Sequence, residues 1–205
     1  MDHDEKMESR PIGDYLDALA SDAPAPGGGS VAGLVGALAA GLGQMVVSLT
    51  RDAPDELVQA NERLAALRAS MIASGAADEL AYAGYVDASR MPKSTPEEKG
   101  LRRATMQEAL KEAVAVPMQL AETASELLET LDPVIRLGSK HVISDAEIGI
   151  TLALACVDAS LVNVRVNIPM IRDKEMAGNL AGHAHKIEQR AHQLAENLRA
   201  TLAER

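Results

Sequence analysis

Aromatic side chains are almost absent from this chain of 205 residues: it has three Tyr, no Phe and no Trp, although 47% of its residues are hydrophobic. Leu, Val, Ile, Met and Ala must therefore fill the core, and small side chains let helices pack closely. Segments of alternating polar and apolar residues, which indicate strands, are also lacking. We predict an all-α fold in which residues 1–205 form a single domain, a bundle of about six helices, several of them long.

Positive charge and cysteine are scarce as well. The chain has 20 Lys and Arg against 30 Asp and Glu, a net charge of −10, so we expect no nucleic acid and no membrane among its partners. A local basic patch could still hold an anionic small molecule. The single cysteine, Cys156, excludes an intrachain disulfide framework. The first ten residues, MDHDEKMESR, lack the apolar segment of a signal peptide. We therefore expect a cytoplasmic protein whose residues 1–9 are flexible.

A long uncharged stretch covers residues 31–49, directly after SDAPAPGGGS at residues 21–30. It approaches the length of a membrane span. However, Gln44, Ser48 and several glycines reduce its hydrophobicity, and we identify no second span and no flanking basic cluster. We predict a central helix rich in Gly and Ala, from about residue 30 to residue 50, buried by protein on all sides.

Two capping signals predict helix starts. In the first, Thr95 precedes Pro96, and Glu98 completes a capping box. This helix should run to about residue 131. In the second, Ser144 and Glu147 have the same spacing, so a further helix should begin at Ser144 and end between residues 167 and 170. A last amphipathic helix is expected from about residue 174 to residue 203.

One carboxylate occupies a position that the helical register assigns to the interior. Leu57, Leu64 and Met71 lie seven residues apart, and the next position in this series is Asp78. Burial would raise the pKa of Asp78, which suits a general acid or base. The alternative is that the helix rotates or bends at Gly75 and leaves Asp78 solvated, because buried Asp is rare.

Polar residues in the second apolar stretch also stand out. Asp158 and Arg165 lie seven residues apart and could form an ion pair, belong to a wider network or be separately solvated. Asn163 and Asn167 share a helix face, and their amides need partners. Backbone groups are the usual partners, and the alternative is a heteroaromatic ligand. The densest basic patch surrounds residues 91–99, where most such charges are simply solvated: Arg90, Lys93, Lys99, Arg102 and Arg103.

Three segments together resemble a known family. They are SDAPAPGGGSVAGLVGALAAGLGQMVVSLT, RMPKSTPEEKGLRRATMQEALKEAVAVP and SDAEIGITLALACVDASLVNVRVNI. Their order and spacing are similar to the formiminotransferase-cyclodeaminase C-terminal family, which includes free-standing bacterial methenyltetrahydrofolate cyclohydrolases. The resemblance covers residues 12–173. It implies an all-helical fold, a homodimer, a tetrahydrofolate substrate, no metal or redox cofactor, and a catalytic aspartate at the position of Asp78.

The resemblance and the residue patterns together give a set of candidate substrate-binding residues. Glycines without side chains would let a flat pterin ring approach the start of the central helix, although they could instead serve a close chain crossing at a dimer interface. Ser30 could be the N-cap of that helix or a ligand donor. The candidates are Gly27, Gly28, Gly29, Ser30, Lys93, Arg102, Arg103, Asp145, Asn163 and Asn167.

Two reactions are implied by the resemblance, both at the carbon between N5 and N10 of tetrahydrofolate. A cyclohydrolase adds water to the methenyl bridge, and a cyclodeaminase closes a formimino group onto N10 and releases ammonia. We slightly favour the cyclohydrolase, because no transferase segment is present to supply the formimino group. A non-catalytic helical dimer that binds folate or acts as a scaffold is the alternative from another class.

Overall fold

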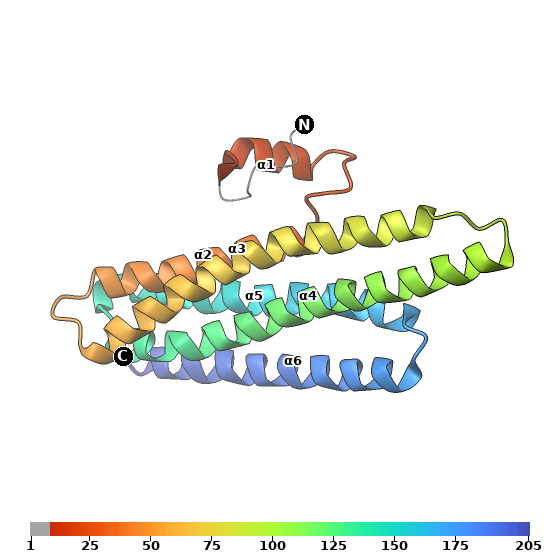
Figure 1. Ribbon diagram of the computed structural model, residues 1–205. Helices are drawn as coiled ribbons and strands as arrows, with labels where there is room; N and C mark the ends of the chain where they lie inside the picture. The colour runs from red at the N-terminus through yellow and green to blue at the C-terminus, as the bar shows by residue number, and fades with distance from the viewer. Residues whose placement is uncertain (1–8) are drawn as a thin grey trace.

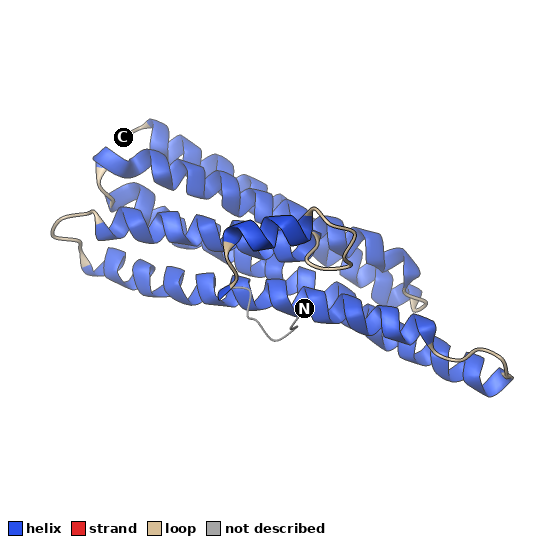
Figure 2. Cartoon of the chain, turned by 90° about the horizontal axis from the view of Figure 1, so that it is seen from above, coloured by secondary structure: helices blue, strands red, loops and turns tan. Residues whose placement is uncertain are grey.

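The computed structural model describes residues 9–205, and throughout this range the regular structure is helical (Figures 1 and 2). The prediction of an all-α fold with about six helices is confirmed. The expectation of flexibility at residues 1–8 lies outside the described residues. The helices are α1 (Ile12–Leu19), α2 (Gly28–Ser48), α3 (Asp55–Arg90), α4 (Pro96–Leu137), α5 (Ile143–Asn167) and α6 (Lys174–Ala203), with short 3-10 turns η2 (Lys140–Val142) and η3 (Ile168–Met170).

Four helices form the body of the molecule. α2 packs on α3 and α5, and α4 packs on the same two helices from the other side, so that α2, α3, α4 and α5 make a four-helix bundle. α6 lies along α4 and α5, while α1 lies outside the bundle (Figure 1). Antiparallel neighbours joined by short connections are typical of such bundles.

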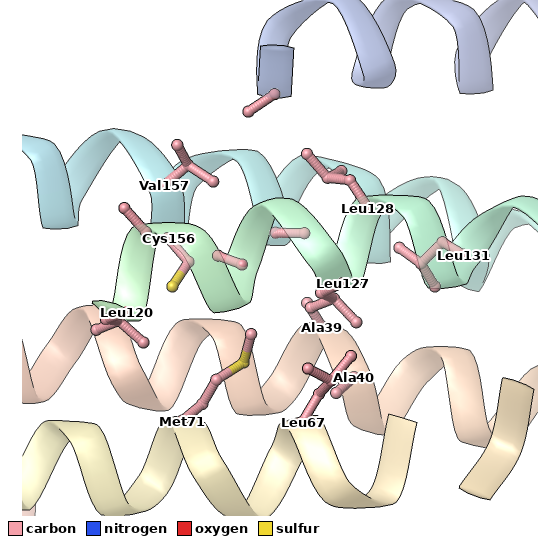
Figure 3. Close-up of a cluster of buried hydrophobic side chains, with 14 of the residues drawn as sticks. Ala39, Ala40, Leu67, Met71, Leu120, Leu127, Leu128, Leu131, Cys156 and Val157 are labelled. Carbon is pink, nitrogen blue, oxygen red and sulfur yellow. The ribbon is translucent and has the colours of Figure 1, made fainter. Parts of the chain in front are cut away.

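Small residues let α2 pack closely against its neighbours. A Cβ atom on Gly33 would lie 2.6 Å from the Met71 carbonyl oxygen of α3. A Cβ on Gly36 would lie 2.7 Å from Met71 Sδ and 2.8 Å from Cys156 Sγ. Figure 3 shows these two sulfur-bearing side chains extending from different helices into the shared core. The core is thus built from aliphatic and sulfur-containing side chains at close helix spacing, as the composition predicts.

Two helices are long and apolar enough to cross a membrane by length and composition alone. One is α2, and the other is the segment Lys140–Met170, which contains α5. The expectation of no second such segment is therefore wrong, because α5 carries only a few charges. The most apolar parts of these segments are 56% and 44% buried within the bundle. α2 is one of the four helices of the bundle, but the prediction that protein buries it on all sides is wrong, because the bundle covers only part of its circumference and Leu38 remains 54% exposed.

The predicted capping box at the start of α4 is confirmed. The Thr95 hydroxyl accepts a hydrogen bond from the Glu98 backbone N–H at 3.2 Å, and the Glu98 carboxylate accepts one from the Thr95 N–H at 3.0 Å. The second predicted box is wrong. α5 begins at Ile143, directly after η2, so Ser144 already lies inside the helix and its side chain caps nothing.

α3 and α4 are the longest helices, and their connected ends extend beyond the rest of the bundle as a hairpin arm (Figures 1 and 2). The basic patch surrounds the tip of this arm. Part of it is used locally, because Arg102 donates a hydrogen bond to the Ser89 carbonyl oxygen at 2.9 Å. Lys93 and Arg103 are exposed.

Candidate functional site

A cavity of about 330 Å³ opens where the first turn of α2 meets the middle of α3 and the end of α5. This volume lies within the range of ligand pockets. Its walls come from six parts of the chain, since the loop before α2, α4 and η3 also contribute. The lining residues are Pro24, Ala25, Gly27, Gly28, Gly29, Asp78, Glu79, Ala81, Tyr82, Tyr85, Ala113, Asn163, Val166, Asn167 and Met170.

Gly29 and Asp78 are neighbours in the cavity. A Cβ atom built on Gly29 would overlap the carboxylate of Asp78, so the carboxylate lies directly against the backbone of α2. Only a residue without a side chain permits this approach. Gly27 and Gly28 differ in this respect, because a Cβ on Gly27 would meet no atom within 4 Å and a Cβ on Gly28 would make ordinary contact with Asn163. A side chain at position 29 would therefore displace the Asp78 carboxylate from this place.

Asp78 is half-buried, and its surroundings disfavour the charged form. Burial raises the pKa of this carboxyl group above its ordinary value of 3.8, and the nearby negative charge of Glu79 raises the pKa further. The register prediction is correct through Met71, which is buried. One turn later the buried residue is Gly75, and Ser74 is only partly covered. Asp78 therefore lies at the edge of the core, in the cavity wall.

The start of α2 is stabilised without a side-chain cap. Gly27 occupies the N-cap position, so the prediction of Ser30 as N-cap is wrong. Ser30 is buried in the first turn, and its hydroxyl lies 3.2 Å from the hydroxyl of Tyr15 in α1. The first N–H groups of a helix lack intrahelical partners and carry partial positive charge. Because Gly28 and Gly29 have no side chains, a ligand can approach these N–H groups closely, and they can donate hydrogen bonds to its acceptor atoms.

Asn163 and Asn167 lie in the cavity wall opposite α3, four residues apart on α5. Asn167 uses its amide nitrogen to donate a hydrogen bond to the Ala113 carbonyl oxygen of α4 at 2.8 Å. For Asn167 the partner is thus a backbone group, which is the usual partner of a side-chain amide. The Asn163 amide lies beside Gly28. Both amides are thus brought to the same cavity as Asp78.

Asp158 and Arg165 do not pair with each other. Asp158 contacts His192 at 3.0 Å, and Arg165 donates a hydrogen bond to Glu188 at 2.9 Å. Both partners belong to α6, so these charges attach the last helix to α5. They are structural contacts on the side of α5 that faces α6.

Several candidate residues do not line the cavity. Ser30 is turned towards Tyr15, and Lys93, Arg102 and Arg103 belong to the hairpin arm. Asp145 lies in the first turn of α5, about 27 Å from Asn163 along the helix axis. Roles for these residues in substrate binding stay predictions. Within residues 9–205, no three His, Cys, Asp or Glu side chains gather as metal ligands would.

Sequence reasoning missed part of the site. Tyr82, Glu79 and Met170 line the cavity, and so does Tyr85, whose hydroxyl lies 4.0 Å from Met170 Sδ. A signal for the tyrosines was available, because Tyr82 and Tyr85 follow Asp78 at spacings of four and seven residues. Residues with these spacings share one face of a helix.

Comparisons with known proteins show which family the chain belongs to. The formiminotransferase-cyclodeaminase family model matches residues 11–186. Methenyltetrahydrofolate cyclohydrolase of Methylorubrum extorquens is 36% identical over 169 residues, which span 80% of this chain and 81% of that protein. Formimidoyltransferase-cyclodeaminase of Gallus gallus is 33% identical over 185 residues, 84% of this chain but 33% of that longer protein. The crystal structure of formiminotetrahydrofolate cyclodeaminase from Thermotoga maritima has a TM-score of 0.85 at 26% identity, covering 96% of this chain and 98% of that one. The chain belongs to the formiminotransferase-cyclodeaminase family.

Proposed function

We propose that this chain is a tetrahydrofolate one-carbon enzyme that acts at the carbon between N5 and N10, and that its reaction is the hydrolysis of methenyltetrahydrofolate. The observation that carries the proposal is the Asp78 carboxylate, held against Gly29 in a cavity of ligand size. A relative named as a methenyltetrahydrofolate cyclohydrolase, matched over 81% of its own length, supports the choice of reaction.

In this reaction Asp78 would act as the proton carrier. Its carboxylate takes a proton from water as the water oxygen bonds to the cationic methenyl carbon. The same proton then passes to N5 as the bond from the carbon to N5 breaks. The hydroxyl proton of the intermediate leaves to solvent, and the product is 10-formyltetrahydrofolate. A base with a raised pKa suits this role at neutral pH, and its negative charge stabilises the substrate cation.

The remaining cavity residues would hold the substrate, with no metal or redox cofactor in any step. The exposed backbone at Gly28 and Gly29 lets a flat pterin ring approach, and the amides of Asn163 and Asn167 supply polar contacts. The anionic glutamate tail would extend towards the basic residues of the hairpin arm, where Lys93 and Arg103 are exposed. We place this activity in the cytoplasm.

We propose a homodimer as the working unit. Its interface would be the α2/α5 face, which we define as Leu38 and Met45 of α2, Leu49 directly after α2, and Ile148, Val162 and Val166 of α5. All six side chains are apolar and exposed, and α2 carries no charged residue. Exposed apolar patches of this kind mark sites of association.

The deciding experiment offers the purified chain methenyltetrahydrofolate and formiminotetrahydrofolate side by side. We expect loss of the methenyl absorbance with the first substrate. Asp78→Asn should lower this rate at least about 100-fold, because the proton carrier is lost. The matched control is Asp87→Asn, an exposed carboxylate on the same helix outside the cavity. Undiminished turnover by Asp78→Asn would rule out the proposed role, and tight binding without turnover by the unaltered chain would favour the folate-binding scaffold.

The second candidate is the cyclodeaminase reaction. It is favoured by the match to the Thermotoga maritima protein, which is named a formiminotetrahydrofolate cyclodeaminase and spans nearly the same length. Asp78 would then move the proton between N10 and the departing ammonia. Release of ammonia from formiminotetrahydrofolate, faster than hydrolysis of the methenyl compound, would select this reaction.

A further inference from the structure

Aromatic residues in this chain are concentrated at one place. The sequence has three tyrosines, no Phe and no Trp. Tyr82 and Tyr85 line the cavity, and Tyr15 contacts Ser30 in the turn of α2 that borders it. The core, by contrast, consists of Leu, Ala, Val, Ile and Met with Cys156 and Tyr15. A chain that packs its bundle almost without aromatics therefore places two of them in a ligand-sized cavity.

Burial in the core explains little of the position of these two side chains. Tyr82 is 49% exposed, and Tyr85 is only partly buried where it packs against the edge of the core. Both lie on the face of α3 that carries Asp78, at spacings of four and seven residues. The Tyr85 hydroxyl lies 4.0 Å from Met170 Sδ, which links α3 to η3 across the end of the cavity. α3 thus presents a carboxylate followed by two phenol rings along one wall.

The opposite wall has different chemistry. Asn163 and Asn167 of α5 offer amides, and the orientation of Asn167 is fixed by its hydrogen bond to the Ala113 carbonyl oxygen. A flat conjugated ring needs a face that accepts stacking and an edge that accepts hydrogen bonds. The tyrosines of α3 supply the stacking face, and the amides of α5 supply the hydrogen bonds to the edge.

We propose that Tyr82 and Tyr85 form a stacking wall for the flat ring of the bound folate, and that Asn163 and Asn167 contact its polar edge. This inference rests on the proposed function and adds the orientation of the substrate to it. With its ring against α3, the ligand has its reactive carbon on the side of Asp78 and Gly29. Tyr82 is the more exposed of the two rings, and Tyr85 lies beside Met170.

Variants of both tyrosines test the wall, with 5-formyltetrahydrofolate as the binding probe. Tyr82→Leu and Tyr85→Leu should each raise the Kd about fivefold and raise KM more than they lower kcat, because a stacking face is lost while Asp78 remains. Tyr82→Phe and Tyr85→Phe keep the ring and should bind within twofold of the unaltered chain. Leu80→Ala is the matched control, since Leu80 is 75% exposed on the same helix and does not line the cavity. The proposed stacking wall would be overturned if the Leu variants had the Kd of the unaltered chain, or if the Phe variants bound as weakly as the Leu variants.

A measurement on the unaltered chain covers the case in which a variant does not fold. Saturating 5-formyltetrahydrofolate should slow the nitration of Tyr82 by tetranitromethane at least about fivefold, as read by mass spectrometry, because a stacked ring shields the phenol. Nitration at an unchanged rate in a protein that turns over its substrate would overturn the stacking wall and leave the proposed function intact. If the unaltered chain neither binds nor converts either folate, both proposals fail.

Discussion

At the residue scale, Asp78 is distinguished by two neighbours of opposite kind. Gly29 contributes no side chain and leaves room for the carboxylate, while Glu79 contributes a like charge in the same cavity. The first neighbour determines where the carboxylate lies, and the second influences its protonation. Each can be changed without touching Asp78 itself.

The charge of Glu79 should be visible in the pH dependence of catalysis. As a base in the free enzyme, Asp78 must lose its proton, so kcat/KM should fall as the pH drops through the raised pKa of Asp78. Glu79→Gln removes a charge that raises this pKa, and the acid limb of the profile should therefore move to lower pH. Glu62→Gln is the control, because Glu62 is exposed on the same helix away from the cavity. An acid limb that shifts equally in both variants, or in neither, contradicts this account.

Gly29→Ala tests the close approach of α2 to Asp78. The new Cβ would overlap the carboxylate, so the carboxylate must move away from the start of the helix. We expect kcat to fall at least about tenfold, since small displacements of a catalytic group are costly. Gly182→Ala in α6, outside the cavity and the α2/α5 face, meets no atom within 4 Å and should keep full activity with an unchanged circular dichroism spectrum. Full activity in Gly29→Ala would show that the contact has no catalytic importance.

At the scale of elements, the sequence predicts helices best where local signals determine them. The capping box of Thr95 and Glu98 and the last helix, Lys174–Ala203, agree with the structure. The connection between α4 and α5 does not, because it depends on contacts between distant residues. The Ser139 N–H donates to the Thr50 hydroxyl at 2.9 Å, and Arg205 donates to the Gly138 carbonyl oxygen at 2.8 Å. These contacts fix a turn that no local pattern reveals.

The site divides in the same way. Asp78 could be predicted from the helical register and the resemblance, and the glycines from their position before an apolar helix. Glu79 and Met170 could not, since their place in the cavity depends on how α3, α5 and η3 meet. Asp145 shows that a residue of a recognisable motif need not lie in the cavity. It belongs to a recognisable motif but lies at the far end of α5 from the cavity.

Thr95→Ala tests the local signal at the tip of the hairpin arm. Loss of the hydroxyl removes the hydrogen bond from the Glu98 N–H, which should lower the free energy of unfolding by about 1 kcal/mol. Ser94→Ala is the control, because Ser94 takes part in the cap through its backbone N–H, which the substitution preserves. Urea denaturation measures the global change, and faster hydrogen exchange in the first turn of α4 would locate it. Equal stabilities for the two variants would contradict the role of the Thr95 side chain.

At the scale of the whole molecule, the α2/α5 face is an exposed apolar surface that packing within one chain does not explain. Leu38 and Met45 lie seven residues apart on α2, and Ile148 and Val162 lie fourteen residues, or twice seven, apart on α5. This spacing keeps apolar side chains along one line of each helix, as in paired helices. The face also reaches the cavity, because Val166 belongs to both. Association through the face would therefore cover one edge of the cavity.

Leu38→Glu should convert the proposed dimer into a monomer in sedimentation experiments, because a symmetric interface would bury two like charges without partners. Val58→Glu is the control, since Val58 is a 46% exposed apolar residue on α3, outside the α2/α5 face. A dimeric Leu38→Glu variant, or a monomeric unaltered chain, would contradict this interface. Because Asp78 and Gly29 belong to the same chain, the monomer should retain most of its kcat. Its KM should rise, since the edge of the cavity at Val166 is then open to solvent.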